Sequence, residues 1–147
     1  MSELRELYQE TILEHSKKPR NYGEMPSANH KAEGYNPLCG DHYTIFLKLE
    51  GEAIADISFH GAGCAISKAS ASMMTQSLKG KSTQDAEALF QRFHDLVTGH
   101  GGEAEALGKL AVFAGVSEFP LRVKCATLAW HAMRAALHGE QQAVSTE

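Results

Sequence analysis

The sequence is poor in the features that several large classes of protein require. Only three of its 147 residues are cysteines, and its 14 lysines and arginines are outnumbered by 18 aspartates and glutamates. The net charge of −4 argues against nucleic-acid binding, because such a surface needs cations to neutralise phosphates. No apolar run approaches the roughly 20 residues of a membrane-spanning helix. We therefore expect neither a nucleic-acid nor a membrane partner.

The scarcity of cysteine also bears on the compartment. Residues 1–7 lack the apolar core of a signal peptide, which predicts a cytoplasmic protein whose thiols stay reduced. An odd number of cysteines in a reducing compartment does not suit a disulfide framework and favours metal binding or catalysis. The composition, with 43% apolar and 22% charged residues, is that of an ordinary globular protein. We expect one domain over residues 1–147.

Hydrophobic periodicity predicts an α+β fold. Residues 42–50 alternate between apolar and polar positions, with Tyr43, Ile45, Leu47 and Leu49 on one face. Residues 53–59 alternate as well, with Ala55, Ile57 and Phe59 on one face, and Glu50–Glu52 between the two stretches has the composition of a hairpin turn. A third extended stretch, residues 31–36, precedes them. Helical spacing and capping residues predict helices in five segments: 3–16, 65–79, 82–97, 107–114 and 120–137. We expect a small three-stranded antiparallel sheet covered on one face by about five helices, with residues 139–147 as a frayed tail.

Each cysteine lies where a thiolate is expected. Cys39 is separated from Asp41 by one glycine, which lets the loop turn both side chains toward one centre. Cys64 follows Gly61–Gly63 at a predicted helix start, and Cys125 lies about one turn inside the last helix. The positive end of a helix dipole favours a thiolate at both positions. Three thiols and one carboxylate supply the four ligands of a tetrahedral zinc site or an iron–sulfur site.

Other assignments stay open on the residues alone. Each cysteine by itself is compatible with a small buried residue. His42 and His60 adjoin the cysteine motifs and are competing ligands. Four anionic ligands around zinc would leave excess negative charge. Arg122 is either a cation that offsets this charge or an ordinary solvated arginine, and Lys124 is a second cation beside Cys125. A Cys–His nucleophile would use only one of the three thiols, so we favour the metal site.

Three motifs, in order, resemble the U-type iron–sulfur assembly proteins, the family of IscU and the NifU N-terminal domain. The motifs are Asn36–Asp41 (NPLCGD), Gly61–Ser70 (GAGCAISKAS) and Arg122–Trp130 (RVKCATLAW), and the segment Leu7–Gly23 fits as well. Lys124 stands where IscU proteins carry histidine, and the stretch between the second and third cysteines is longer than in IscU. Both features resemble SufU, the zinc-containing branch of this family.

The resemblance implies a SufE/NifU-like fold with zinc held by Cys39, Asp41, Cys64 and Cys125. It implies docking onto a SufS-type cysteine desulfurase, with Cys39 accepting the persulfide sulfur and relaying it to downstream iron–sulfur assembly proteins. On this interpretation the protein is a sulfurtransferase-type partner of the desulfurase rather than a stand-alone enzyme. Because Cys64 and Cys125 are anchored on helices, we expect Cys39 to be the ligand that is released.

Two other functions use the same residues. One is a scaffold on which a [2Fe–2S] cluster is assembled and transferred, with iron or the cluster on the same ligands. The other is a purely structural zinc site, whose metal removal would unfold the domain. The apolar content already suffices for a core, and an exchangeable carboxylate is a poor ligand for a structural staple. We therefore favour the sulfur acceptor and the cluster scaffold over a purely structural zinc site.

Overall fold

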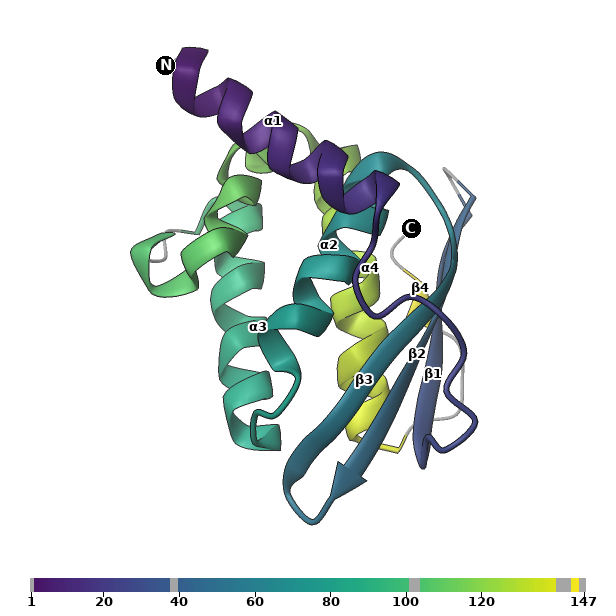
Figure 1. Ribbon diagram of the computed structural model, residues 1–147. Coiled ribbons are helices and arrows are strands. Elements are labelled where there is room, and N and C mark those ends of the chain that lie inside the picture. Colours follow the sequence, from purple (N-terminus) through teal and green to yellow (C-terminus); the bar gives the residue numbers. More distant parts are fainter. Residues whose placement is uncertain (1, 38–39, 101–103, 140–143, 146–147) are drawn as a thin grey trace.

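The computed structural model describes residues 2–37, 40–100, 104–139 and 144–145. The helices lie to one side of a twisted sheet (Figure 1). In chain order the elements are α1 (Ser2–Lys17), β1 (His30–Asn36), β2 (Asp41–Glu50), β3 (Ala53–Ala62), α2 (Ala65–Leu78), α3 (Thr83–Thr98), the 3₁₀ helix η1 (Ala104–Glu118), α4 (Pro120–Leu137) and β4 (Val144–Ser145). Three antiparallel strands and five helices among the described residues confirm the α+β prediction.

The sheet brings three strand ends to one place. Its order is β3-β2-β1-β4, and both β1 and β3 run antiparallel to β2. Asn36 at the end of β1 pairs with Asp41 at the start of β2, and His42 pairs with Ala62 at the end of β3. β4 pairs in parallel with β1, so residues 144–145, which we expected in a frayed tail, form a short edge strand.

Alternation along the strands builds the apolar face of the sheet. Three alternate side chains of β2 are fully buried, as predicted: Tyr43, Ile45 and Leu47. The expectation that Ala55 shares a face with Ile57 and Phe59 is wrong, because Ala55 is exposed and Ile54 is fully buried instead. A register shift between Lys48 and Leu49 is the cause, since a bulge gives one strand an extra residue and reverses the alternation beyond it.

The helices form two layers over this face. α4 packs on β1 and β2, α2 packs on β3 and α4, and α3 with η1 lies farther from the sheet (Figure 1). Trp130 of α4 stacks on Phe93 of α3 with ring centroids 4.5 Å apart, and Phe113 of η1 meets Phe93 edge-on at 5.6 Å. η1 includes the helix predicted over residues 107–114, but it is longer and is interrupted at Gly108, where φ is 57°.

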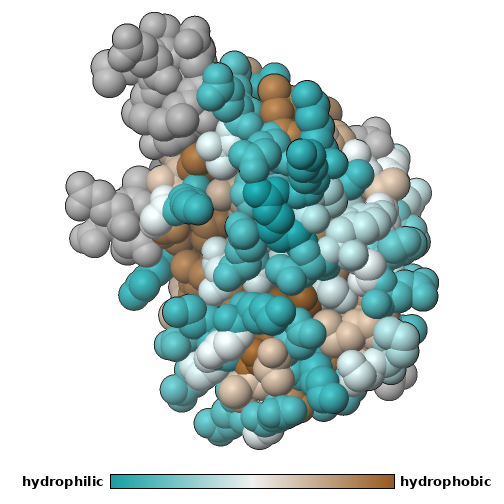
Figure 2. Space-filling view, viewed as in Figure 1, coloured by the Kyte–Doolittle hydropathy of each residue, from teal (hydrophilic) through white to brown (hydrophobic). Residues whose placement is uncertain are grey.

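The surface is mixed in character. Hydrophilic side chains cover most of the face shown in Figure 2, with hydrophobic ones in small separate areas. Among the residues whose burial the structure describes, the exposed large hydrophobic ones are scattered over several parts of the chain: Leu13, Tyr22, Tyr35, Phe119 and Leu121. None of the helices in the described part of the chain combines the length and the apolar character needed to cross a membrane.

Candidate metal centre

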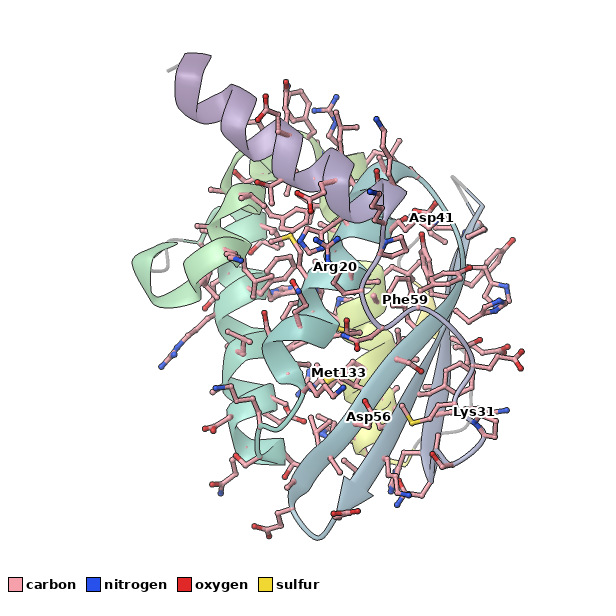
Figure 3. All side chains as sticks on the ribbon, viewed as in Figure 1. Arg20, Lys31, Asp41, Asp56, Phe59 and Met133 are labelled. Atoms are coloured by element: carbon pink, nitrogen blue, oxygen red, sulfur yellow. The ribbon has the colours of Figure 1, made fainter. Side chains whose placement is uncertain are left out.

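Three of the four predicted ligands converge from three different elements. Asp41 begins β2, Cys64 directly precedes α2, and Cys125 lies in α4 about one turn from its start. One carboxylate oxygen of Asp41 and the two sulfur atoms all lie within 4.8 Å of one another. Figure 3 places Asp41 at the end of the sheet where β2 begins. Residues 23 and 84 positions away from Asp41 in the sequence therefore meet it at this end of the sheet.

Asp41 is buried, with 1% of its surface exposed, and its two oxygens have different surroundings. Oδ1 accepts a hydrogen bond of 2.9 Å from the backbone N–H of Cys64. Oδ2 lies 3.7 Å from the Cys64 sulfur. One oxygen thus fixes the carboxylate to the loop before α2, while the other faces the Cys64 thiol.

Cys64 is the N-cap residue of α2, as the helix-start prediction requires. Its backbone is extended (φ −70°, ψ 169°), and its sulfur accepts a hydrogen bond of 3.5 Å from the backbone N–H of Ser67. A side chain at Gly61 would place Cβ 2.1 Å from the carbonyl oxygen of His42, and φ there is 143°. The glycine before the loop is therefore required for β3 to approach β2 so closely.

Hydrogen bonds favour the thiolate form of Cys64. Its pKa is lowered to about 6, first by a hydrogen bond with Cys125 and then by the Ser67 N–H and hydroxyl. Partial burial and the nearby Asp41 carboxylate act in the opposite direction but are outweighed. A thiolate is the form that binds metals.

Next to Cys125, a buried hydrogen-bonded link joins α2 and α4. Cys125 is only 5% exposed, and the next residue, Ala126, accepts a hydrogen bond of 2.6 Å from the Ser70 hydroxyl of α2. Ser70 in turn accepts a hydrogen bond of 3.1 Å from the indole N–H of Trp130. This link fixes the spacing of α2 and α4, which carry Cys64 and Cys125.

The arrangement fits a small tetrahedral metal ion. Zinc binds cysteine sulfur at about 2.3 Å, so the ligand atoms of a tetrahedral site are about 3.8 Å apart. Separations of up to 4.8 Å can close to that value with small side-chain movements. Two thiols and a carboxylate suit Zn²⁺, and the same donor set can hold iron. Among the described residues no histidine joins this group, and His42 lies 3.7 Å from Glu33 instead.

The remaining predicted residues have different outcomes. Cys39 lies outside the described residues, so its role as ligand and acceptor stays a prediction. Arg122 is exposed in the first turn of α4, with its guanidinium 4.3 Å from the centre of the Phe119 ring. Lys124 is half-buried and directly precedes Cys125. For both cations, a contribution to the charge of the site remains a prediction.

Sequence reasoning missed two hydroxyl groups that line the site. Tyr43, predicted only as one of the alternating apolar residues of its strand, has its hydroxyl 3.0 Å from the hydroxyl of Ser67. Burial raises the pKa of Tyr43 far above its ordinary value, so this hydroxyl keeps its proton. For Ser67 a signal was present, because a residue three positions after an N-cap lies beside the capping side chain. For Tyr43 no local signal existed.

The family relationship follows from sequence and fold together. The model of the NifU-like N terminal domain matches residues 7–126. The zinc-dependent sulfurtransferase SufU of Bacillus subtilis is 40% identical over 92% of this chain and 92% of its own, and the iron-sulfur cluster assembly scaffold protein IscU of Streptococcus pyogenes is 41% identical over 93% and 86%. The SufU structure from Fervidobacterium islandicum superposes with a TM-score of 0.83 at 34% identity, over 87% of this chain and 94% of that one. The chain therefore belongs to the family of the NifU-like N-terminal domain.

Proposed function

We propose that the protein serves iron–sulfur cluster biogenesis as a zinc-bound sulfur acceptor, which takes sulfur from the persulfide of a cysteine desulfurase. The observation that carries this proposal is the convergence of Asp41, Cys64 and Cys125 at one end of the sheet. The similarity to a zinc-dependent sulfurtransferase over nearly the whole of both chains supports it. The partner we propose is a SufS-type desulfurase in the cytoplasm, with later iron–sulfur assembly proteins as recipients.

Asp41, Cys64 and Cys125 would hold the zinc together with Cys39. The ion supplies positive charge that keeps the cysteine sulfurs deprotonated and protects them from oxidation. Cys39 is separated from Asp41 by one residue, and two residues of chain span at most about 7 Å. Arg122 and Lys124 would offset part of the negative charge of this ligand set.

Sulfur transfer in this proposal is a thiol exchange on Cys39. The Cys39 thiolate attacks the outer sulfur of the desulfurase persulfide, and a new sulfur–sulfur bond forms on Cys39. The sulfur–sulfur bond of the desulfurase breaks, and its cysteine leaves as a thiolate with the bonding electron pair. The hydrogen stays on the outer sulfur, so the step needs no external oxidant or reductant.

Cys64 and Cys125 are better placed to remain bound to the metal than to accept sulfur. Cys64 is fixed by the Asp41 carboxylate at its backbone N–H and by Ser67 at its sulfur. Cys125 is buried in α4 behind the link from Ser70 to Ala126. Cys39, in the short connection between β1 and β2, is the third thiol and the candidate acceptor.

The test is the stimulation of a SufS-type desulfurase, measured as sulfide released from cysteine with a reductant. We expect the wild-type zinc protein to stimulate the enzyme and Cys39→Ser to lose most of that effect. Ser117→Ala is a matched control, because its hydroxyl bonds only to a local carbonyl oxygen of η1 at 3.4 Å. Equal stimulation by Cys39→Ser and wild type would contradict the assignment.

A second function shares the ligands and has its own support. The Streptococcus pyogenes relative is named as a scaffold protein for cluster assembly, and Asp41 with the cysteines can hold iron as well as zinc. Anaerobic reconstitution with iron and sulfide separates the two. A stable [2Fe–2S] cluster that transfers to an apo-ferredoxin would favour the scaffold, whereas tightly held zinc that iron does not displace favours the sulfur acceptor.

A further inference from the structure

We propose that Ser70 is a positioning residue of the metal centre, which holds α2 and α4 at the separation that a small tetrahedral ion requires. It acts through the helices that carry two of the ligands, because Cys64 directly precedes α2 and Cys125 lies in α4. The inference rests on the metal site of the proposed function but not on the transfer of sulfur.

The two hydrogen bonds of Ser70 each have only one possible direction. The carbonyl oxygen of Ala126 can only accept, so the Ser70 hydroxyl donates to it at 2.6 Å. The indole N–H of Trp130 can only donate, so the Ser70 oxygen accepts from it at 3.1 Å. Ser70 and Ala126 are fully buried and Trp130 is 1% exposed, so water does not compete for these groups. The single hydroxyl hydrogen is used once, and both bonds to α4 form together.

The two thiols are held by different parts of the fold. The Asp41 carboxylate accepts a hydrogen bond of 2.9 Å from the backbone N–H of Cys64, which ties Cys64 to β2. The place of Cys125 depends on α4, which packs so closely on β1 that a Cβ at Gly34 would lie 3.1 Å from the Leu128 side chain. Apolar packing of this kind is not directional, so it does not by itself fix how α4 lies relative to α2.

The Ser70 link supplies the missing direction. It joins α2 to Ala126, the residue that follows Cys125, and a hydrogen bond weakens steeply when its distance or angle departs from the optimum. The bond from Trp130 polarises the Ser70 hydroxyl and strengthens its bond to Ala126. Movement of α4 away from α2 therefore costs both bonds at once.

This constraint favours a small ion over a larger one. The ligand atoms lie within 4.8 Å of one another and close to about 3.8 Å around zinc. Cd²⁺ prefers the same thiolate ligands but is larger, so it needs the sulfurs farther apart. Ser70→Ala removes the donor to Ala126 and leaves the buried Trp130 N–H without its acceptor, so the helices can separate.

The first experiment compares the dissociation constants for Zn²⁺ and Cd²⁺, each measured by competition with a chelating indicator. Ser70→Ala should weaken zinc binding by up to roughly tenfold, the effect of one buried hydrogen bond. Cadmium binding should weaken less, so the ratio of zinc to cadmium affinity falls. Ser72→Ala is the matched control, because Ser72 is also a fully buried serine of α2, but its hydroxyl bonds to His15 and the backbone N–H of Arg20. Its ratio should equal that of wild type.

The second experiment reads the link directly. Trp130 is the only tryptophan of the chain, so its indole N–H gives a single signal in the NMR spectrum of the ¹⁵N-labelled protein. Zinc draws the two thiols together, and we expect this to shift the indole signal of wild type. The shift should be the same in Ser72→Ala and largely lost in Ser70→Ala.

The outcomes separate positioning from a merely structural role. Zinc and cadmium affinities that fall by the same factor in Ser70→Ala, or that do not change, would overturn the inference, as would an indole signal of wild type that zinc does not move. If Ser70→Ala does not fold, Trp130→Phe decides the matter, because loss of the indole donor should lower the same ratio and an unchanged ratio would overturn the inference. Neither measurement uses a desulfurase, so failure of the Cys39→Ser stimulation assay would refute the sulfur-acceptor function without altering these results.

Discussion

Replacement of Gly63 by alanine tests whether the metal site is built as tightly as the structure indicates. The added Cβ would meet the Ser67 hydroxyl at 2.5 Å, and both Asp41 Oδ1 and the Tyr43 hydroxyl at 2.6 Å. None of these atoms is the end of a long flexible side chain, and all three residues are at most 1% exposed. Relief of the clash must therefore move Asp41 or the start of α2.

The magnitude follows from two separate effects. Overpacking of a buried site costs about 1–3 kcal/mol, which should appear in the free energy of unfolding of the metal-free protein. Displacement of groups that orient a metal ligand lowers metal affinity about 10- to 100-fold, which should appear in the zinc dissociation constant. The two effects are measured by urea unfolding with a chelator and by competition with a zinc indicator.

Gly115→Ala is the matched control for this variant. No atom lies within 4 Å of a Cβ at Gly115, and its φ is not positive. Zinc affinity should therefore equal that of wild type, and stability should change by less than about 1 kcal/mol. If Gly63→Ala behaves like Gly115→Ala in both assays, the close packing inferred around Asp41 and Cys64 is wrong.

Three further predictions address the support of the site and its dependence on pH. Ser70→Ala should lower the free energy of unfolding by about 1–3 kcal/mol, measured by urea unfolding, because the Trp130 N–H loses its buried acceptor. Phe93→Ala should lower it by about 3–5 kcal/mol in the same assay, because the ring is fully buried and stacks on Trp130. Burial, with a smaller effect of Arg20, lowers the pKa of His15 below its ordinary 6.5, so stability is complete above about 6.5 and falls as the pH drops from there to the folded-state pKa. Unfolding at a series of pH values should show a smaller fall for His15→Gln than for wild type, and equal falls would contradict this assignment.

The sequence predicts well what is encoded locally. The hairpin between β2 and β3, the cap at Cys64 and the position of Cys125 one turn into α4 all depend on residues close together in the chain. The turn residues Glu50–Glu52 signal the hairpin, the glycines before Cys64 signal the loop that precedes α2, and the proline signals the start of α4. For this reason the helical placement of two ligands could be predicted before their distance was known.

Features that depend on distant residues could not be predicted. The exposure of Ala55 follows from a bulge in its pairing with β2, which the alternation of residues 53–59 does not reveal. The contact of Tyr43 with Ser67 joins residues 24 positions apart on a strand and a helix. The pairing of residues 144–145 with β1 likewise depends on the position of a sheet edge that only the folded chain defines.

We propose that zinc is held by Asp41 and the three cysteines while Cys39 accepts sulfur. The most direct test of this proposal is peptide mapping by mass spectrometry, after the zinc protein has been incubated with a SufS-type desulfurase and cysteine. We expect the persulfide on the peptide that contains Cys39, with Cys64 and Cys125 unmodified. A persulfide on Cys64 or Cys125 but not on Cys39, or on none of the three, would contradict the account.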